Sequence, residues 1–376
     1  MYLPLEELKK ATQFTREGKL MEATSLIQQA LGRSEAAATD PAPAPRTQGR
    51  PPHTQVLATE VSDVEFREAT PAAQRTASAP ASGTAATFDA HRFSSGGRSY
   101  AYRLYVPARP DDSPLPVIVM LHGCTQDSAD FAAGTAMNEQ AAGRGCIVVY
   151  PEQLARANSM RCWNWFEPAH QRRGGEPAMI AALAQHVVQK CNGDAKRVYV
   201  AGLSAGGAMA VLAGQLYPEV FAAIGVHSGL PAASATDVQS AQAAMRRPPR
   251  TPGARLAGTA AVPTIVFHGR SDRTVHPENG RQVVEQAAAR AAAAGIALQR
   301  DEQEVTLAGR PVKRAVYRDA GQVRRLEHWE IGGAAHAWSG GSAAGSYTDV
   351  AGPGASAAMV DFFLEQRLGS GADCQP

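Results

Sequence analysis

A serine stands in a glycine-rich turn just past the middle of the chain. The segment Gly202-Leu203-Ser204-Ala205-Gly206 follows the short apolar run 198–201 and precedes a helical pattern over 205–218. In a strand-turn-helix of this kind, the two glycines avoid collisions with neighbouring backbone, and the serine hydroxyl is raised above the sheet. Negative charge that develops at the helix N-terminus is stabilised there. We therefore predict that Ser204 is a nucleophile, whereas the alternative is a turn of small residues without chemical role.

A serine hydroxyl is a weak nucleophile, and it needs a base that is in turn held by an acid. With a serine in such a turn, the acid and then the histidine follow it along the chain. Asp272 comes directly after an apolar run in HGRSDRTV, and His336 comes after the last apolar run in GGAAHAW. We predict Asp272 as the acid and His336 as the base. Residues that fit these two roles less well are Asp301, Asp319, His227, His268 and His328.

Ester or amide cleavage through a serine also needs hydrogen-bond donors for the oxyanion of the tetrahedral intermediate. One donor is expected from the backbone N–H of Ala205, the residue after the nucleophile. The other is expected from the loop LHGCTQ, at 121–126, which follows an early apolar run. Its His-Gly start points to the Cys124 N–H as the second donor.

The segments around these residues alternate between strand and helix patterns. Short apolar runs that predict strands occur at 98–107, 116–123, 146–152, 197–202, 222–229, 263–269 and 327–333. Helical patterns occur at 177–190, 205–218, 277–295 and 354–368. Alternation of this kind predicts an α/β fold with a mostly parallel sheet covered by helices on both faces. Open sheets of this class bind ligands at the carboxyl ends of their strands, where the polar residues and glycines gather.

The first 86 residues have a different character. Residues 1–34 carry two short amphipathic patterns that predict a helical hairpin, and 35–86 form an Ala/Pro/Ser/Thr-rich linker that cannot bury much apolar surface. The catalytic domain is expected over 87–376. A single hairpin cannot bury its apolar face alone, so we expect it to dock on the main domain or to self-associate. Docking on a partner protein or a polymer granule is the alternative.

Composition excludes several classes of protein. The chain has 376 residues and a formal net charge of +2, so no charge excess favours nucleic acid or an anionic membrane surface as a partner. No apolar run is long enough to span a bilayer. The N-terminus does not read as a secretory leader, which predicts a cytoplasmic protein, the alternative being export with a leader that this sequence lacks.

Several motifs, in this order, resemble the poly(3-hydroxybutyrate) depolymerase-type esterase family, which also includes feruloyl and acetylxylan esterases. They are LHGCTQ, VVYPEQ, CWNWFEP, RGGEPAMI, RVYVAGLSAGGAMA, YPEVFAA, HSGLP, FHGRSD and GAAHAW. The resemblance covers roughly 88–368. It implies an α/β-hydrolase and supports Ser204, Asp272 and His336 as the catalytic triad. Secretion is frequent in that family, so an extracellular location is the alternative to the cytoplasmic one.

Three tryptophans are candidate substrate contacts. Trp163 and Trp165 flank Asn164 in a loop before a helix, where their flat rings are suited to wall an acyl pocket. Trp338 is the third candidate. The alternative for these rings is packing in the core or in loops. Glu176, in RGGEP, is expected to cap or position the helix at 177–190, and the resemblance allows a role in supporting the site.

The five cysteines are too sparse for a disulfide framework, and none of their spacings fits a zinc site. Reduced, buried cysteines are the simplest interpretation. However, Cys124 and Cys162 are both expected above the strand ends near the site. A bridge between them is therefore the alternative, and it would indicate an oxidising compartment.

These patterns together predict a serine esterase that needs no metal and no organic cofactor. The expected substrates are small-molecule or oligomeric esters, either short hydroxyalkanoate oligomers or the acyl groups of plant polysaccharide. A serine peptidase of the same fold is the alternative chemistry, although no patch for an N-terminal amine can be assigned. A protein whose main role is docking through residues 1–34 is the alternative of another class.

Overall fold

The computed structural model describes residues 85–109, 111–248 and 260–369. The predicted helical hairpin over 1–34 and nearly all of the predicted linker over 35–86 lie outside these residues. Within them, the domain expected from residue 87 onward begins with a strand at Thr87. No helix in these described ranges is long and apolar enough to cross a bilayer.

Strands in the described ranges form one ten-stranded sheet and one two-stranded sheet. In spatial order, the large sheet consists of β1 (Thr87–Ser95), β2 (Arg98–Val106), β4 (Ile147–Pro151), β3 (Leu115–Leu121), β5 (Gly193–Leu203), β6 (Ala223–His227), β7 (Thr264–Gly269), β10 (Arg324–Ile331), β9 (Arg310–Arg318) and β8 (Gln299–Leu307). The small sheet pairs β11 (Trp338–Ser339) with β12 (Thr348–Asp349).

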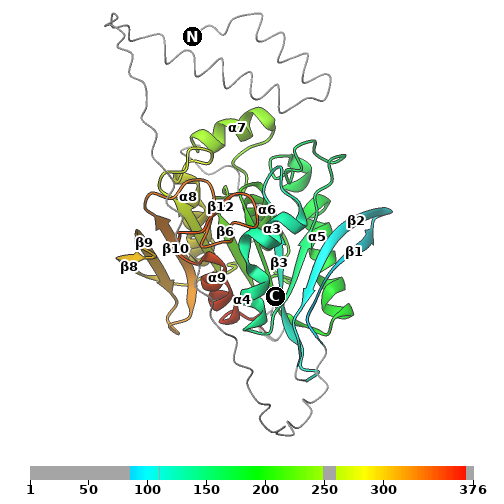
Figure 1. Cartoon of the computed structure of the whole chain (residues 1–376). Helices are drawn as coiled ribbons and strands as arrows, with labels where there is room; N and C mark the ends of the chain where they lie inside the picture. Colours follow the sequence, from blue (N-terminus) through cyan, green and yellow to red (C-terminus); the bar gives the residue numbers. More distant parts are fainter. Residues whose placement is uncertain (1–84, 110, 249–259, 370–376) are drawn as a thin grey trace, which may run out of the picture. The chain divides into compact units, whose positions relative to one another are not determined.

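The six strands from β4 to β10 are parallel to one another, and an antiparallel hairpin continues the sheet at each edge. Figure 1 shows the β1–β2 and β8–β9 hairpins at opposite ends of the molecule. Parallel strands buried on both faces are continuous apolar runs, which is why the sequence patterns identify them. Because these strands are parallel, the carboxyl ends of β5, β7 and β10 all lie on the same side of the sheet, which we call the strand-end edge.

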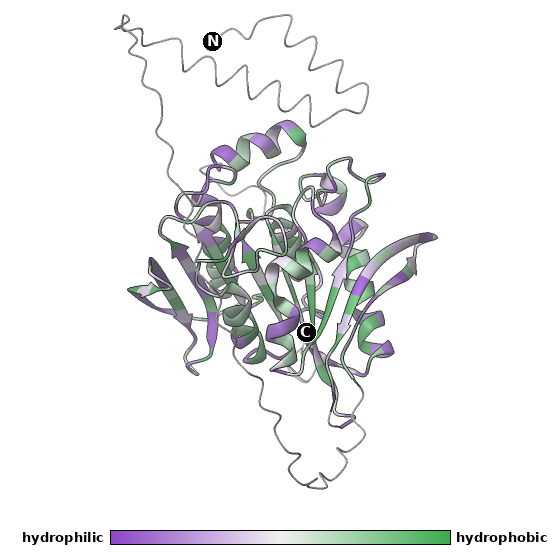
Figure 2. Cartoon of the chain, viewed as in Figure 1, coloured by the Kyte–Doolittle hydropathy of each residue, from purple (hydrophilic) through white to green (hydrophobic). Residues whose placement is uncertain are grey.

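Helices cover both faces of the sheet, as predicted. The helices in chain order are α3 (Ser128–Thr135), α4 (Met137–Ala142), α5 (Gly175–Lys190), α6 (Ala205–Leu216), α7 (Val238–Arg246), α8 (Glu278–Ala293) and α9 (Ala355–Leu364), with a 3-10 turn at Pro168–His170. Helices α5, α6 and α8 belong to one buried cluster that also contains Val117 and Val119 of β3. Helices α3, α4 and α9 pack with Ile118 and Met120 on the opposite face. Figure 2 shows the apolar colour concentrated in the central strands and in α6.

The sequence patterns miss β1, β8 and β9. Seven of the nine residues in β8, QRDEQEVTL, are exposed, so this strand has no buried apolar face to give it a recognisable pattern. Charged edge strands of this type protect a sheet from pairing with other chains. The hairpin that they form extends the sheet beyond β10.

Candidate active site

Ser204 has the backbone conformation that a nucleophile turn requires. Its φ is +57° and its ψ is −119°, so the chain reverses sharply between β5 and α6. A Cβ placed on Gly202 would lie 2.4 Å from the backbone of Gly206, and one on Gly206 would lie 2.1 Å from the carbonyl oxygen of Leu121. Both glycines are therefore needed for close approach of backbone segments, which is the role predicted from the sequence.

Backbone hydrogen bonds hold this turn against the neighbouring strand. The Ser204 N–H donates to the His227 carbonyl at 2.9 Å, and the Ser204 carbonyl accepts from Ala208 N–H at 2.9 Å. The residue is 8% exposed. Among the described residues, no hydrogen bond involves the Ser204 hydroxyl.

Asp272 and His336 are in direct contact, as their predicted roles require. His336 Nδ1 lies 2.7 Å from Asp272 Oδ2. Because a carboxylate only accepts, Nδ1 carries the proton and the lone pair of Nε2 remains available as a base. The His336 side chain is 11% exposed, whereas that of Asp272 is fully buried.

Further donors orient the Asp272 carboxylate. Its Oδ1 accepts from the N–H groups of Thr274 and Val275 at 2.8 and 2.9 Å. His268 Nε2 donates to the Val275 carbonyl at 2.9 Å and lies 3.4 Å from Oδ2. Burial alone would raise the pKa of Asp272, but the hydrogen bonds from His268 and His336 outweigh it and hold this pKa well below its ordinary value. The acid therefore stays ionised beside the imidazole.

The sheet register aligns the ends of β5, β7 and β10, the strands that precede Ser204, Asp272 and His336. Leu203 pairs with His227, and His227 pairs with Phe267. Two residues further along β7, Gly269 pairs with Ile331 of β10. The structure thus joins Asp272 to His336 and places Ser204 at the same edge of the sheet, two strands away from β7.

The loop after β3 lies against the nucleophile turn. A Cβ on Gly123 would be 3.7 Å from the Ser204 Cβ. The Gly123 N–H donates to Gln126 Oε1 at 2.9 Å, and Thr125 N–H donates to the Met160 carbonyl at 2.7 Å. Within the described ranges, the Cys124 N–H between them has no hydrogen-bond partner. The Ala205 N–H belongs to the first turn of α6, where N–H groups have no intrahelical acceptor. Both predicted oxyanion donors are therefore available.

Cys124 is bonded to Cys162 across 38 residues. The simplest expectation, reduced cysteines throughout, is thus wrong for this pair, and the alternative bridge is present. Cys146 and Cys191 are free, and burial raises the pKa of Cys146 to about 12. The bridge ties the loop after β3 to the loop that contains Trp163.

Glu176 supports the same region. Its carboxylate accepts from Asn164 N–H and Asn164 Nδ2, both at 2.8 Å, and from Gln153 Nε2 at 2.6 Å. The Gln153 N–H in turn donates to His122 Nε2 at 3.1 Å. Glu176 stands in the first turn of α5, but its side chain binds the Trp163 loop instead of capping the helix.

The three tryptophans are buried, which agrees with the alternative of packing in the core or in loops, and their contact with a substrate stays a prediction. Trp163 and Trp338 are 0% exposed and Trp165 is 5% exposed. Trp163 packs against His122, and Trp338 stacks on His227 at a centroid distance of 5.1 Å. Large apolar rings next to a sheet gain more from burial in the core than from contact with solvent.

The sequence predicts a structural role for His227, and it makes His268 only a weak candidate for the base. His227 is structural, because its Nε2 accepts from Ser339 N–H at 3.0 Å and burial lowers its pKa to about 3. His268, by contrast, has a place in the site beside Asp272. The four-residue spacing between His268 and Asp272 is the only signal of this contact in the sequence, and it is a weak one.

Comparison with known proteins agrees with this geometry. A sequence model of the family described as esterase PHB depolymerase matches residues 99–302, which is more than half of the chain. The mostly parallel sheet with helices on both faces is the fold of an α/β-hydrolase. The chain belongs to the esterase PHB depolymerase family.

Individual relatives carry the names of two kinds of esterase. Poly(3-hydroxyalkanoate) depolymerase C of Paucimonas lemoignei is 37% identical over 182 residues, covering 46% of this chain and 44% of that protein. Feruloyl esterase B of Neurospora crassa is 32% identical over 199 residues, covering 48% of this chain and 67% of that protein. The match thus spans less than half the length of the first relative.

Among solved structures, acetyl xylan esterase from Aspergillus awamori is similar with a TM-score of 0.54 and 19% sequence identity. The similarity covers 71% of this chain and 94% of that structure. At this level of identity it shows the shared α/β-hydrolase fold.

Proposed function

We propose that this protein is a serine esterase that cleaves carboxylic esters through an acyl-enzyme. The observation that carries the proposal is the contact of His336 with Asp272, at 2.7 Å, on the same sheet edge as the strained turn of Ser204. A serine held at positive φ at a helix N-terminus and a carboxylate–histidine pair at the same strand ends are the components that acyl transfer requires.

In the proposed reaction, His336 Nε2 takes the proton of Ser204 while the serine oxygen attacks the ester carbonyl carbon. The Ala205 and Cys124 N–H groups donate to the resulting oxyanion. The carbon–oxygen bond to the alcohol then breaks, and His336 gives its proton to the leaving oxygen. Water, deprotonated by His336, next attacks the acyl-enzyme, and the acid leaves as Ser204 regains its proton. Asp272 remains ionised and stabilises the imidazolium throughout.

Short hydroxyalkanoate esters or oligomers are the proposed substrates. The 37% identity to a poly(3-hydroxyalkanoate) depolymerase supports this choice. Feruloyl or acetyl esters of plant polysaccharide are the second candidate, which the 32% identity to a feruloyl esterase supports. The three tryptophans are buried, so they offer little exposed aromatic surface in support of a feruloyl group.

We also propose that the protein works in an oxidising compartment. The Cys124–Cys162 bridge supports this location, because disulfides persist in oxidising environments and are rare in the cytosol. This reverses the preference for the cytoplasm that the N-terminal sequence suggested. Thiol titration of protein purified without reductant tests it, and a pair that is fully reduced would contradict it.

The deciding experiment compares the parent protein with Ser204→Ala on p-nitrophenyl butyrate, hydroxybutyrate oligomers, methyl ferulate and acetylated xylan. We expect the parent to prefer hydroxybutyrate oligomers and the variant to lose turnover on every substrate. A Ser204→Ala protein that hydrolyses p-nitrophenyl butyrate at the parent rate would refute the mechanism. A parent that is more active on methyl ferulate would refute the substrate class but not the mechanism.

A further inference from the structure

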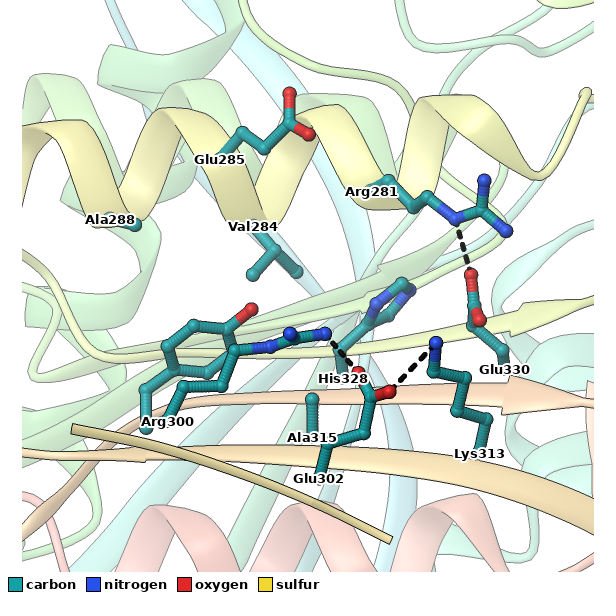
Figure 3. A pocket seen from close by; sticks show the side chains of 11 residues that line it. Arg281, Val284, Glu285, Ala288, Arg300, Glu302, Lys313, Ala315, His328 and Glu330 are labelled. Carbon is teal, nitrogen blue, oxygen red and sulfur yellow. Dashed lines mark hydrogen bonds and ion pairs between the residues drawn. The ribbon is translucent and has the colours of Figure 1, made fainter. Parts of the chain in front are cut away.

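A cavity that lies apart from Ser204 is lined by β10, the strand next to β7, and by its neighbours. Its volume is about 160 Å³. It opens between α8 and the strands β8, β9 and β10 (Figure 3). The side chains that define its character are Arg281, Val284, Ala288, Arg300, Lys313 and His328. Neither Ser204 nor Asp272 nor His336 lines it.

His328 gives this cavity an unsatisfied polar group. The residue is 7% exposed, and its Nε2 is buried with no hydrogen-bond partner in the part of the chain that the structure describes. Figure 3 shows its imidazole directed from β10 toward α8. Burial lowers the pKa of His328 to about 4, so the ring is neutral near pH 7 and each of its nitrogens either donates or accepts. A buried polar atom left unpaired costs free energy, and a ligand that bonds to it would recover that cost.

Charge is unevenly distributed over the floor of the cavity. Lys313 Nζ lies 2.8 Å from Glu302 Oε1, and Arg300 forms an ion pair with the same carboxylate. Two cations thus share one anion. On the opposite side, Glu330 is paired with Arg281 at 2.5 Å.

The lining as a whole holds three cations and three carboxylates, the third being Glu285 of α8. The local excess of positive charge is therefore at Lys313 and Arg300. The Lys313 side chain is 42% exposed and has donors left after its contact with Glu302, so it can receive an anionic group.

An apolar groove continues from the cavity. This neighbouring space, of about 510 Å³, shares Ala288, Arg300 and Tyr317 with the first one and extends past Ile296 and Leu298. A polar recess with an adjoining apolar groove matches a ligand with a polar head and an aliphatic tail.

We propose that the cavity and groove together bind a hydroxyalkanoic acid. The carboxylate would pair with Lys313, the hydroxyl would bond to His328 Nε2, and the alkyl chain would lie along Ala288 and Ile296. Ser204, Asp272 and His336 do not line this site, although Glu330 of its lining pairs with His268 between β10 and β7. Only the choice of a hydroxy acid, which is the product class of the ester cleavage, rests on the proposed function.

Calorimetric titration of the full-length Ser204→Ala protein with 3-hydroxyoctanoate tests the proposal. We expect saturable binding that weakens about tenfold or more in Lys313→Gln and in His328→Phe, because each loses a hydrogen bond to the ligand. Octanoate, which lacks the hydroxyl, should bind more weakly to the starting protein. The affinity of octanoate should be the same for the starting protein and for His328→Phe, because octanoate has no hydroxyl to bond to His328.

Arg318→Gln is the matched control, because Arg318 is a cation on the opposite face of β9. Among the described residues, it donates only to the Gln322 carbonyl. This variant should bind like the starting protein. In addition, His328→Phe should raise the melting temperature of the free protein, since it removes an unsatisfied buried nitrogen.

Three results would overturn the proposal. They are the absence of saturable binding at millimolar 3-hydroxyoctanoate, equal affinity in all variants, and a lower melting temperature of a folded His328→Phe protein.

Hydrolysis of p-nitrophenyl butyrate is measured in parallel on proteins that retain Ser204, where Lys313→Gln should leave the rate unchanged. If no protein hydrolyses the ester, the proposed function fails, while the titration still decides whether the groove binds the acid.

Discussion

The loop after β3 and the loop after β7 lie at the same edge of the sheet, but different interactions hold them. The loop after β3 is anchored from outside, by the Cys124–Cys162 bridge and by the network around Glu176. The loop after β7 is organised around its own functional side chain, since the N–H groups of Thr274 and Val275 both donate to Asp272.

The difference follows from what each loop is proposed to contribute. The loop after β3 offers a backbone N–H, whose direction is set by the whole path of the chain, so it needs restraints at several points. The loop after β7 offers a carboxylate, whose direction is set by hydrogen bonds to its two oxygens. We therefore expect changes in the β7 loop to affect mainly catalysis and changes around the β3 loop to affect mainly stability.

The largest effect is expected for Asp272→Asn. The amide oxygen would still accept the hydrogen bonds from the Thr274 and Val275 N–H groups, so the amide nitrogen would face His336 Nδ1. The amide N–H would then donate to Nδ1, and the proton of the imidazole would move to Nε2, which would have no lone pair left to act as a base. We expect kcat/KM on p-nitrophenyl butyrate to fall on the order of 10⁴-fold, with little change in melting temperature. Asp319→Asn, which removes an ion pair with Arg325, is the control. A loss below about tenfold would contradict the assignment of the acid.

Removal of the disulfide should have the next largest effect, this time on stability. The bridge closes a segment of 38 residues, and its loss in Cys124→Ser with Cys162→Ser should lower the free energy of unfolding by about 3–4 kcal/mol. Urea denaturation measures this change. Cys191→Ser, at a free and half-buried cysteine, should change it far less. If the double variant is as stable as the Cys191 control, the bridge does not hold the loop.

Glu176→Gln should also act mainly on stability, with a smaller magnitude. The amide nitrogen of a glutamine only donates, so it would face another donor, from Asn164 or from Gln153. The buried network would therefore lose at least one hydrogen bond. We expect a loss of about 1–3 kcal/mol in the free energy of unfolding. Glu219→Gln, which removes only the half-exposed ion pair with Arg173, should cost less than about 1 kcal/mol. Equal losses in the two variants would show that Glu176 does not support the loop.

The two loops should also differ in their response to acid. Burial lowers the pKa of His122 below its ordinary 6.5, so the unfolded state binds the extra proton and stability around the β3 loop falls as the pH drops below 6.5. The pKa of Asp272 lies below its ordinary 3.8, so its contribution to stability is lost only below that pH. Each group changes stability by at most about 1.4 kcal/mol per pH unit.

Hydrogen exchange between pH 7 and 4.5, corrected for intrinsic rates, measures this difference. Amides at 122–126 should lose protection over this range, and those at 270–275 should keep it. His122→Gln should reduce the pH dependence of the first group. The same pH dependence in both loops would contradict the comparison.

Much of the centre of this protein was predictable from local patterns. Parallel strands buried on both faces are continuous apolar runs, and a turn that cannot accept a Cβ must contain glycine. The segments around Ser204, Asp272 and His336 were therefore recognisable, and the structure confirms the contact between the acid and the histidine.

Other features depended on which distant segments pack together. The sequence left open whether Cys124 pairs with Cys162, and it suggested substrate contacts for Trp163 and Trp338, which are buried. It gave no indication that β8 and β9 extend the sheet and form the cavity at His328. Burial and side-chain partners are properties of pairs of segments brought together by folding, and residue spacing along one segment does not contain them.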